Sequence, residues 1–186
     1  MTEDLVGSVL VLKATRLLKS AGVPDAARDA RRLFSHAMGV DSSRLTLTLP
    51  DPVAAEDAAV FTTLIARRQN REPVSHLIGK RAFYGREFAV TPAVLDPRPE
   101  TETLIEVALR SHFTKMADLG TGSGCILVTL LAEVPCGQGV GVDLSPSALA
   151  VAARNAQTHG VVDRASFHCA DWLNGISGPF DLIVAN

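Results

Sequence analysis

Short apolar segments alternate with helical patterns through the C-terminal half of the sequence, and this alternation restricts the possible folds more than any other feature. The segments are KMADLG, GVGVDL, ASFHCA and FDLIVAN, and helical spacing fills residues near 125–133 and 146–159. Strands separated by helices form parallel sheets, because a parallel pair needs a crossover long enough to hold a helix. The pattern therefore predicts an α/β fold with the order strand, helix, strand, helix, strand, strand.

The N-terminal part has a different pattern, typical of three short amphipathic helices. They are expected at about residues 5–19, 24–39 and 52–69. The residues expected to face the core are Leu5, Val6, Val9, Leu10 and Leu17 in the first helix, Ala26, Ala30, Leu33, Phe34 and Ala37 in the second, and Val60, Phe61, Leu64 and Ile65 in the third. Three such helices make a small bundle.

Between these parts, the stretch PVSHLIGKRAFYGREFAVTP at residues 73–92 carries β-branched and aromatic residues around two glycines, which favours a pair of strands. Helical spacing resumes in TETLIEVALRSH, after Pro97 and Pro99. We therefore predict an N-terminal helical domain at residues 1–72, a β-hairpin linker at 73–96 and part of an α/β domain at 97–186.

Charge and composition exclude several functions. The formal net charge is −2 at pH 7, so no global field draws the chain to nucleic acid or to an anionic membrane. The first apolar run, residues 5–12, is too short for a membrane span or a secretion signal. The three cysteines and five histidines are scattered without metal-ligand spacing. We expect no metal site, reduced thiols and a cytoplasmic location.

The glycine-rich segment DLGTGSG lies where the first strand of the sheet should lead into a helix. Glycines there let a ligand approach the main chain closely, although a turn needed only for packing is the alternative. The dinucleotide-binding fingerprint needs its third glycine where Cys125 stands, which disfavours a pyrophosphate. An aspartate at the strand end suits a cationic ligand, and S-adenosylmethionine carries an ammonium and a sulfonium group. The candidate residues are Asp118, Gly120, Thr121, Gly122, Ser123 and Gly124.

Two further positions follow the next strands. Asp143 comes 19 residues after Gly124, where a carboxylate can accept both hydroxyls of a ribose, with a helix cap as the alternative. Asp171 and Trp172 follow the third strand and should reach the same sheet edge. There an aspartate can accept from an adenine amino group, and an indole offers a flat apolar wall. The alternative for Trp172 is simple packing.

These residues together resemble a known family. GTGSG after a strand, Asp143, the pair DW and a strand ending in Asn186 are similar to protein-glutamine methyltransferases that modify bacterial and organellar peptide-chain release factors. The segments REPVSHLIGKRAFYG and LDPRPETE resemble the linker hairpin of this family and the approach to its first catalytic helix. The resemblance implies an S-adenosylmethionine-dependent methyltransferase fold, Rossmann-like with an incomplete sheet, behind a small substrate-recognising α-helical bundle and a β-hairpin linker.

The resemblance also implies the reaction. The side-chain amide nitrogen of the glutamine in a release factor's GGQ motif would receive a methyl group from S-adenosylmethionine, which tunes translation termination. Asn186 matches the first residue of the family's Asn-Pro-Pro-Tyr loop and is the expected catalytic residue, in contact with cofactor and substrate. Arg98 and Glu102 of PRPETE would brace the site, with a helix cap or a surface ion pair as the alternative. Release factors are the expected partners of a monomer that binds no nucleic acid directly and no membrane.

The chain departs from the family pattern at Arg71, where glycine is common, and at Asp96, where an apolar residue is common. Because Pro-Pro-Tyr does not follow Asn186, we expect the chain to be inactive alone. The shared Asn-Pro loop leaves a nucleic-acid exocyclic-amine methyltransferase as the first alternative, disfavoured by the lack of a basic stripe. A non-catalytic partner-binding fragment is the second, and a nicotinamide oxidoreductase comes last.

Overall fold

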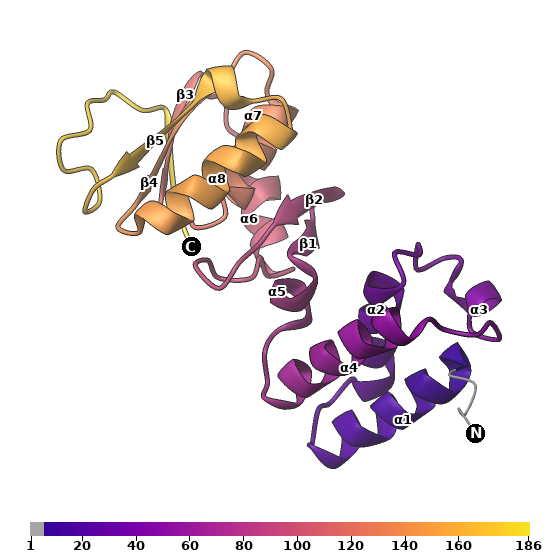
Figure 1. The fold of residues 1–186 in the computed structure, drawn as a ribbon. Helices are drawn as coiled ribbons and strands as arrows, with labels where there is room; N and C mark the ends of the chain where they lie inside the picture. Colours follow the sequence, from indigo (N-terminus) through magenta and orange to yellow (C-terminus); the bar gives the residue numbers. More distant parts are fainter. Residues whose placement is uncertain (1–5) are drawn as a thin grey trace. The chain divides into compact units, whose positions relative to one another are not determined.

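The computed structural model describes residues 6–186, which separate into two units divided between Ile78 and Gly79 (Figure 1). The described part of the first unit holds α1 (Gly7–Ser20), α2 (Ala26–Ala37), α3 (Leu45–Thr48), α4 (Ala55–Gln69) and α5 (Val74–Ile78). The three predicted helices correspond to α1, α2 and α4, whereas the short helices α3 and α5 were not predicted. Leu5, where the first helix was expected to begin, lies outside the described residues.

The predicted inward faces of α2 and α4 are largely confirmed. That of α1 is wrong at Val9 and Leu17, whereas Leu10 is partly buried and packs against the core. Val9 and Leu17 are 45% and 49% exposed, and Val60 on α4 is 50% exposed. A Cβ on Gly7 would lie 2.8 Å from the ring of Phe34, so the glycine lets α1 approach α2 closely. As a result, a different face of α1 packs against the core. Its buried residues are Gly7, Val11, Ala14 and Leu18.

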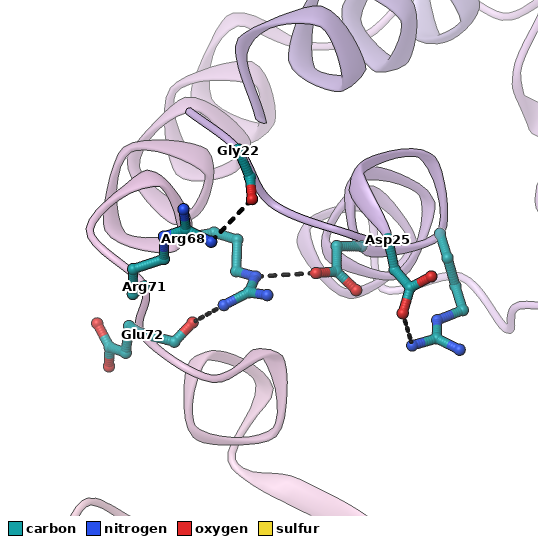
Figure 2. Close-up of polar contacts among 7 residues, drawn as sticks. Gly22, Asp25, Arg68, Arg71 and Glu72 are labelled. Atoms are coloured by element: carbon teal, nitrogen blue, oxygen red, sulfur yellow. Dashed lines mark hydrogen bonds and ion pairs between the residues drawn. The ribbon is translucent and has the colours of Figure 1, made fainter. Parts of the chain in front are cut away.

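Figure 2 shows polar contacts that join the end of α4 to the rest of the first unit. The Arg68 Nε donates to Asp29 on α2 at 2.8 Å, and its Nη1 donates to the carbonyl of Glu72 at 3.1 Å. The Arg71 guanidinium donates to the carbonyl of Gly22, just after α1, at 3.0 Å. Arg71 makes this contact from a backbone φ of 69°, a conformation that favours glycine. Its side chain thus gains a contact at a position where its backbone is strained.

The predicted strand pair is confirmed for part of its range. β1 (Lys80–Phe83) and β2 (Arg86–Ala89) pair antiparallel around a turn in which Tyr84 and Gly85 both have positive φ. That turn matches the right-handed twist of a hairpin. The expectation of a strand is wrong at the start of the range, where Val74–Ile78 form α5. Pro73 supplies a suitable first turn, and the helix buries Val74 and Leu77.

The α/β fold is confirmed in the second unit. After α6 (Thr101–Ala108), the order is β3 (Lys115–Leu119), α7 (Cys125–Glu133), β4 (Gln138–Asp143), α8 (Pro146–Thr158), the 3-10 turn η1 (Val162–Arg164), β5 (Ala165–Cys169) and β6 (Leu182–Ala185). These strands form one parallel sheet in the order β5-β4-β3-β6. The chain therefore steps outward from β3 to β5 and then returns to the other side of β3.

Close packing of α7 on the sheet holds the strand ends in place. Residues 125–131 of α7 are all buried, and Leu127 lies directly against β4. A Cβ on Gly139 would come within 2.4 Å of the Leu127 side chain, and one on Gly141 within 2.8 Å of Phe167. The two glycines of β4 therefore make room for the helix and for β5. Among residues 6–186, no helix has both the length and the apolar character needed to cross a membrane.

Candidate functional site

A cavity of about 460 Å³ opens at the carboxyl ends of all four parallel strands. Because β6 returns to the far side of β3, this is the point where the strand order reverses, and folds of this type bind ligands there. Its lining includes five of the predicted residues, from four separate segments. The complete lining is Leu119, Gly120, Val142, Asp143, Leu144, Ala170, Asp171, Trp172, Ala185 and Asn186.

The glycine loop connects β3 to α7 and forms one wall of this cavity through Gly120. Its last residue, Gly124, is the N-cap of α7 in a left-handed conformation, with φ 75°. A Cβ at Gly124 would lie 3.0 Å from the Cβ of Ala152 on α8. Glycine is needed there both for the backbone angle and for the approach of α8. Thr121, Ser123 and Gly124 are buried and do not line the cavity.

Asp143 holds the loop from the end of β4. Its Oδ2 accepts from the Gly122 N–H and its Oδ1 from the Ser145 N–H, both at 2.9 Å. The cap of α8 is provided by Ser145, whose hydroxyl accepts from the Ala148 N–H at 3.2 Å. Asp143 is therefore not the helix cap. Each of its carboxylate oxygens can accept a second hydrogen bond, and Asp143 lines the cavity.

Asp118 is placed differently from the other candidates, because it is 1% exposed and does not line the cavity. Burial raises the pKa of its carboxyl group to about 6, and nearby Asp143 adds to this rise. The Thr121 hydroxyl, 2.7 Å from Oδ2, lowers the pKa of the carboxyl group, and the backbone N–H of Leu127 lowers it further. Oδ1 is buried and has no hydrogen-bond partner. The group is thus a buried acid that titrates near neutral pH.

A second part of the cavity lining comes from residues just after β4 and β5. Asp171 is exposed, and Trp172 is 67% exposed with a φ of 51°. Leu144, after β4, is 69% exposed and lines the same cavity. Trp172 is therefore not a packed core residue. The two apolar side chains and the carboxylate give this part of the lining the character of a site for a flat group with polar edges.

The two candidate residues of the PRPETE motif, Arg98 and Glu102, do not contact the cavity. The Glu102 carboxylate accepts from the Tyr84 N–H at 2.7 Å, so it holds the hairpin turn. Arg98 is exposed, and its side chain makes no hydrogen bond or ion pair with any residue in 6–186. Neither residue lines the cavity. Asn186 does, and its Nδ2 donates to the Thr101 hydroxyl at 2.8 Å. Sequence reasoning missed Thr101, although it lies inside the PRPETE motif.

The described residues contain no group of three or more His, Cys, Asp or Glu side chains able to hold a metal ion. Sequence reasoning also missed the apolar lining of the cavity, which includes Leu119, Val142, Leu144, Ala170 and Ala185. These residues lie at or just after the ends of strands already predicted. Their position in the sequence, next to the candidate aspartates and Asn186, was the signal from which they could have been predicted.

Comparison with known proteins agrees with this architecture. Residues 111–186 match a family model described as a methyltransferase domain. The second unit thus belongs to the methyltransferase class. Residues 10–79 match a second model, described as the PrmC N-terminal domain. The two matches cover separate parts of the chain, in the helical unit and in the α/β unit.

Relatives identify the family. A release factor glutamine methyltransferase from Cereibacter sphaeroides is 54% identical over 91% of this chain and 61% of its own length. Proteins of the same name from Rhodospirillum rubrum and Chlorobaculum tepidum are 44% and 35% identical, over 98% and 100% of this chain and 57% and 69% of their own lengths. The chain belongs to the release factor glutamine methyltransferase family. It spans about 60% of the length of the first two relatives.

Proposed function

We propose that the chain is the cofactor-binding and substrate-recognising part of an S-adenosylmethionine-dependent methyltransferase that modifies the glutamine side-chain amide of peptide-chain release factors. The observation that carries the proposal is the charge of the cavity at the strand ends. Its lining contains Asp143 and Asp171 and no lysine, arginine or histidine. Family membership supports the substrate, because the relatives carry the name release factor glutamine methyltransferase.

The residues present fit such a cofactor. A volume of about 460 Å³ lies within the range of small-molecule sites. An acidic lining attracts an ammonium or sulfonium group and repels a pyrophosphate, which favours S-adenosylmethionine over a dinucleotide. When bound, S-adenosylmethionine supplies the methyl group as an electrophile. The carboxylate of Asp143 would accept from ribose hydroxyls, and Trp172 would flank the adenine while Asp171 accepts from its amino group.

Asn186 would orient the substrate amide. An amide nitrogen is a poor nucleophile, since its lone pair is delocalised, so positioning must provide most of the rate gain, up to about 7–11 kcal/mol. The Nδ2 of Asn186 already donates to Thr101. Its Oδ1 is then held in one orientation and can accept an N–H from the glutamine side chain. Asn186 does not ionise, so its part is to aim the nitrogen.

The cofactor proposal is tested by titration of the chain with S-adenosylhomocysteine, followed through Trp172, the single tryptophan in the sequence. We expect saturable quenching of Trp172 fluorescence, with no response to NADH. Asp143→Ala should weaken binding at least about tenfold, because it removes a charged acceptor and the contact to the Gly122 N–H. Binding of NADH in place of S-adenosylhomocysteine, or an unchanged affinity in the variant, would contradict the proposal.

The substrate proposal is tested separately by binding. Calorimetric titration of the chain with a release factor, with duplex DNA and with an RNA hairpin compares the three substrate classes directly. We expect binding of the release factor alone. A preference for either nucleic acid would instead support a methyltransferase of exocyclic amines, and would leave the cofactor result intact.

A further inference from the structure

One buried side chain outside the cavity contacts both the glycine loop and the hairpin. Asn155 on α8 is fully buried, and its Oδ1 accepts from the Ala89 N–H at 2.8 Å. Its Nδ2 donates to the carbonyl of Ala89 at 3.0 Å and to the carbonyl of Ser123 at 2.8 Å. The two donors and the acceptor atom of this amide are thus all in use, and the contact to Ser123 is buried.

The Ser123 contact places Asn155 on one side of the glycine loop. Asp143 holds the other side through the Gly122 N–H at 2.9 Å. Two consecutive residues of the loop are therefore hydrogen-bonded by side chains from two different elements, the end of β4 and the last turn of α8. The conformation of the loop depends on both hydrogen bonds, because a loop rich in glycine has little conformational preference of its own.

The Ala89 contact fastens the end of β2 to the same side chain. Phe88, which precedes it, is fully buried, and its ring centroid lies 4.8 Å from that of His159, the residue that caps the C-terminus of α8. The opposite end of the hairpin is held by Glu102, through the Tyr84 N–H at 2.7 Å. The hairpin therefore contacts α8 at one end and α6 at the other.

We propose that Asn155 is a positioning residue that couples the hairpin to the glycine loop, so that cofactor affinity depends on the position of the hairpin. The proposal rests on the proposed function only for the identity of the ligand. Asparagine suits the position because a carboxamide can donate to two carbonyls and accept from one N–H at once. Leucine can do neither, and an ionised aspartate would set an oxygen against two carbonyl oxygens.

The coupling acts through the population of loop conformations. In the wild-type chain Asn155 holds the binding-competent arrangement before the ligand arrives. In Asn155→Leu the carbonyl of Ser123 loses its partner and the loop samples other arrangements. If the competent fraction falls to about a tenth, apparent affinity falls about tenfold, because the two are proportional. A residue that only stabilised the core would lower the unfolding temperature and leave the affinity of the folded protein unchanged.

The test compares Asn155→Leu with Val161→Ala, which removes buried apolar atoms from the core of the same unit at a position outside the glycine loop and the hairpin. Affinity for S-adenosylhomocysteine is measured through Trp172 fluorescence. Hydrogen exchange of ligand-free chain is measured for peptides covering residues 86–90 and 120–124. We expect about tenfold weaker binding and faster exchange in both peptides for Asn155→Leu. Val161→Ala should keep wild-type affinity and exchange there, even at an equal loss of thermal stability.

A third variant, Asn155→Asp, tests the proposal through the pH dependence of cofactor affinity, which a purely structural role would leave unchanged. The neutral acid donates to one carbonyl, whereas the ionised form repels both, so affinity relative to wild type should fall as pH rises. The titratable groups around the site, Asp118, Asp143, His159 and Glu87, are common to both proteins and cancel in this ratio. A ratio independent of pH, or the same exchange pattern in Asn155→Leu and Val161→Ala, would overturn the proposal. If the wild-type chain bound no cofactor, the proposed function would fail, and hydrogen exchange would still decide the coupling.

Discussion

Replacing Asp118 by asparagine should stabilise the second unit at neutral pH. The Asp118 carboxyl is buried, and its pKa is raised to about 6 from the ordinary value near 4. At 1.36 kcal/mol for each tenfold change in the ionisation constant, ionising this group in the folded unit costs about 3 kcal/mol. An asparagine keeps the shape of the side chain and never ionises. The Thr121 hydroxyl can still donate to its Oδ1.

The sign of the pH dependence follows from linkage. The folded-state pKa lies above the unfolded one, so the stability due to the protonated group is fully present below about pH 4 and is lost as pH rises through about 6. About 2 kcal/mol of the total should disappear between pH 4.5 and 7.5. The difference in unfolding free energy between Asp118→Asn and wild type should therefore grow in favour of the variant over this interval.

Urea unfolding followed through Trp172 measures this difference for the second unit, because the single tryptophan lies there. Wild type, Asp118→Asn and Asp171→Asn are compared from pH 4.5 to 7.5. Asp171 is an exposed carboxylate that lines the cavity, so its replacement controls for the loss of one charge. A difference between Asp118→Asn and wild type that stayed constant with pH would refute the reasoning. So would an equal pH dependence for Asp171→Asn.

Three further substitutions have expected outcomes. Gly124→Ala should destabilise the second unit by about 2 kcal/mol in urea unfolding, because φ is 75° and its Cβ would meet Ala152 at 3.0 Å. Arg71→Ala should have a free energy of unfolding about 1 kcal/mol lower than Arg71→Gly, measured by urea unfolding followed by circular dichroism of the helices. Both variants lose the Gly22 contact, and only glycine relieves the positive φ. Arg68→Met should cost about 3–5 kcal/mol by leaving the Asp29 carboxylate buried without its partner, and Asp29→Ala added to it should restore part of that loss.

The sheet and the cavity could be predicted from local patterns. Buried parallel strands are short apolar runs, and the carboxyl ends of such strands meet at one edge, so Asp143, Asp171 and Asn186 could be placed together without coordinates. The face of α1 could not be predicted in the same way. Its sequence carries two apolar sets at helical spacing, and the choice between them depends on Gly7 meeting Phe34, a contact between different helices.

Long-range polar contacts were also beyond sequence reasoning. Asn155 and Ala89 are 66 residues apart, and Asn186 and Thr101 are 85 apart. The local sequence around an asparagine inside a helix, or a threonine at the start of one, does not predict a hydrogen-bond partner far away in the chain. The structure changes the interpretation of Glu102 for the same reason, because its carboxylate meets a backbone N–H of the hairpin turn.

The raised pKa of Asp118 gives a direct test of whether this carboxylate serves a cationic ligand. Its Oδ1 is buried without a partner, so a positive charge placed nearby would favour the ionised form and lower the pKa. Near pH 6 about half of the wild-type molecules carry this proton. Binding of S-adenosylmethionine at that pH should then release up to about half a proton.

Calorimetry in two buffers of different ionisation enthalpy measures this release, because each liberated proton adds the buffer's heat to the observed enthalpy. We expect binding enthalpies that differ between buffers for wild type and agree for Asp118→Asn. The variant should also bind more weakly while being the more stable protein. A buried carboxylate that is retained for ligand binding would lower stability and raise affinity in this way. Equal binding enthalpies for wild type in both buffers would show that the cation does not act on Asp118.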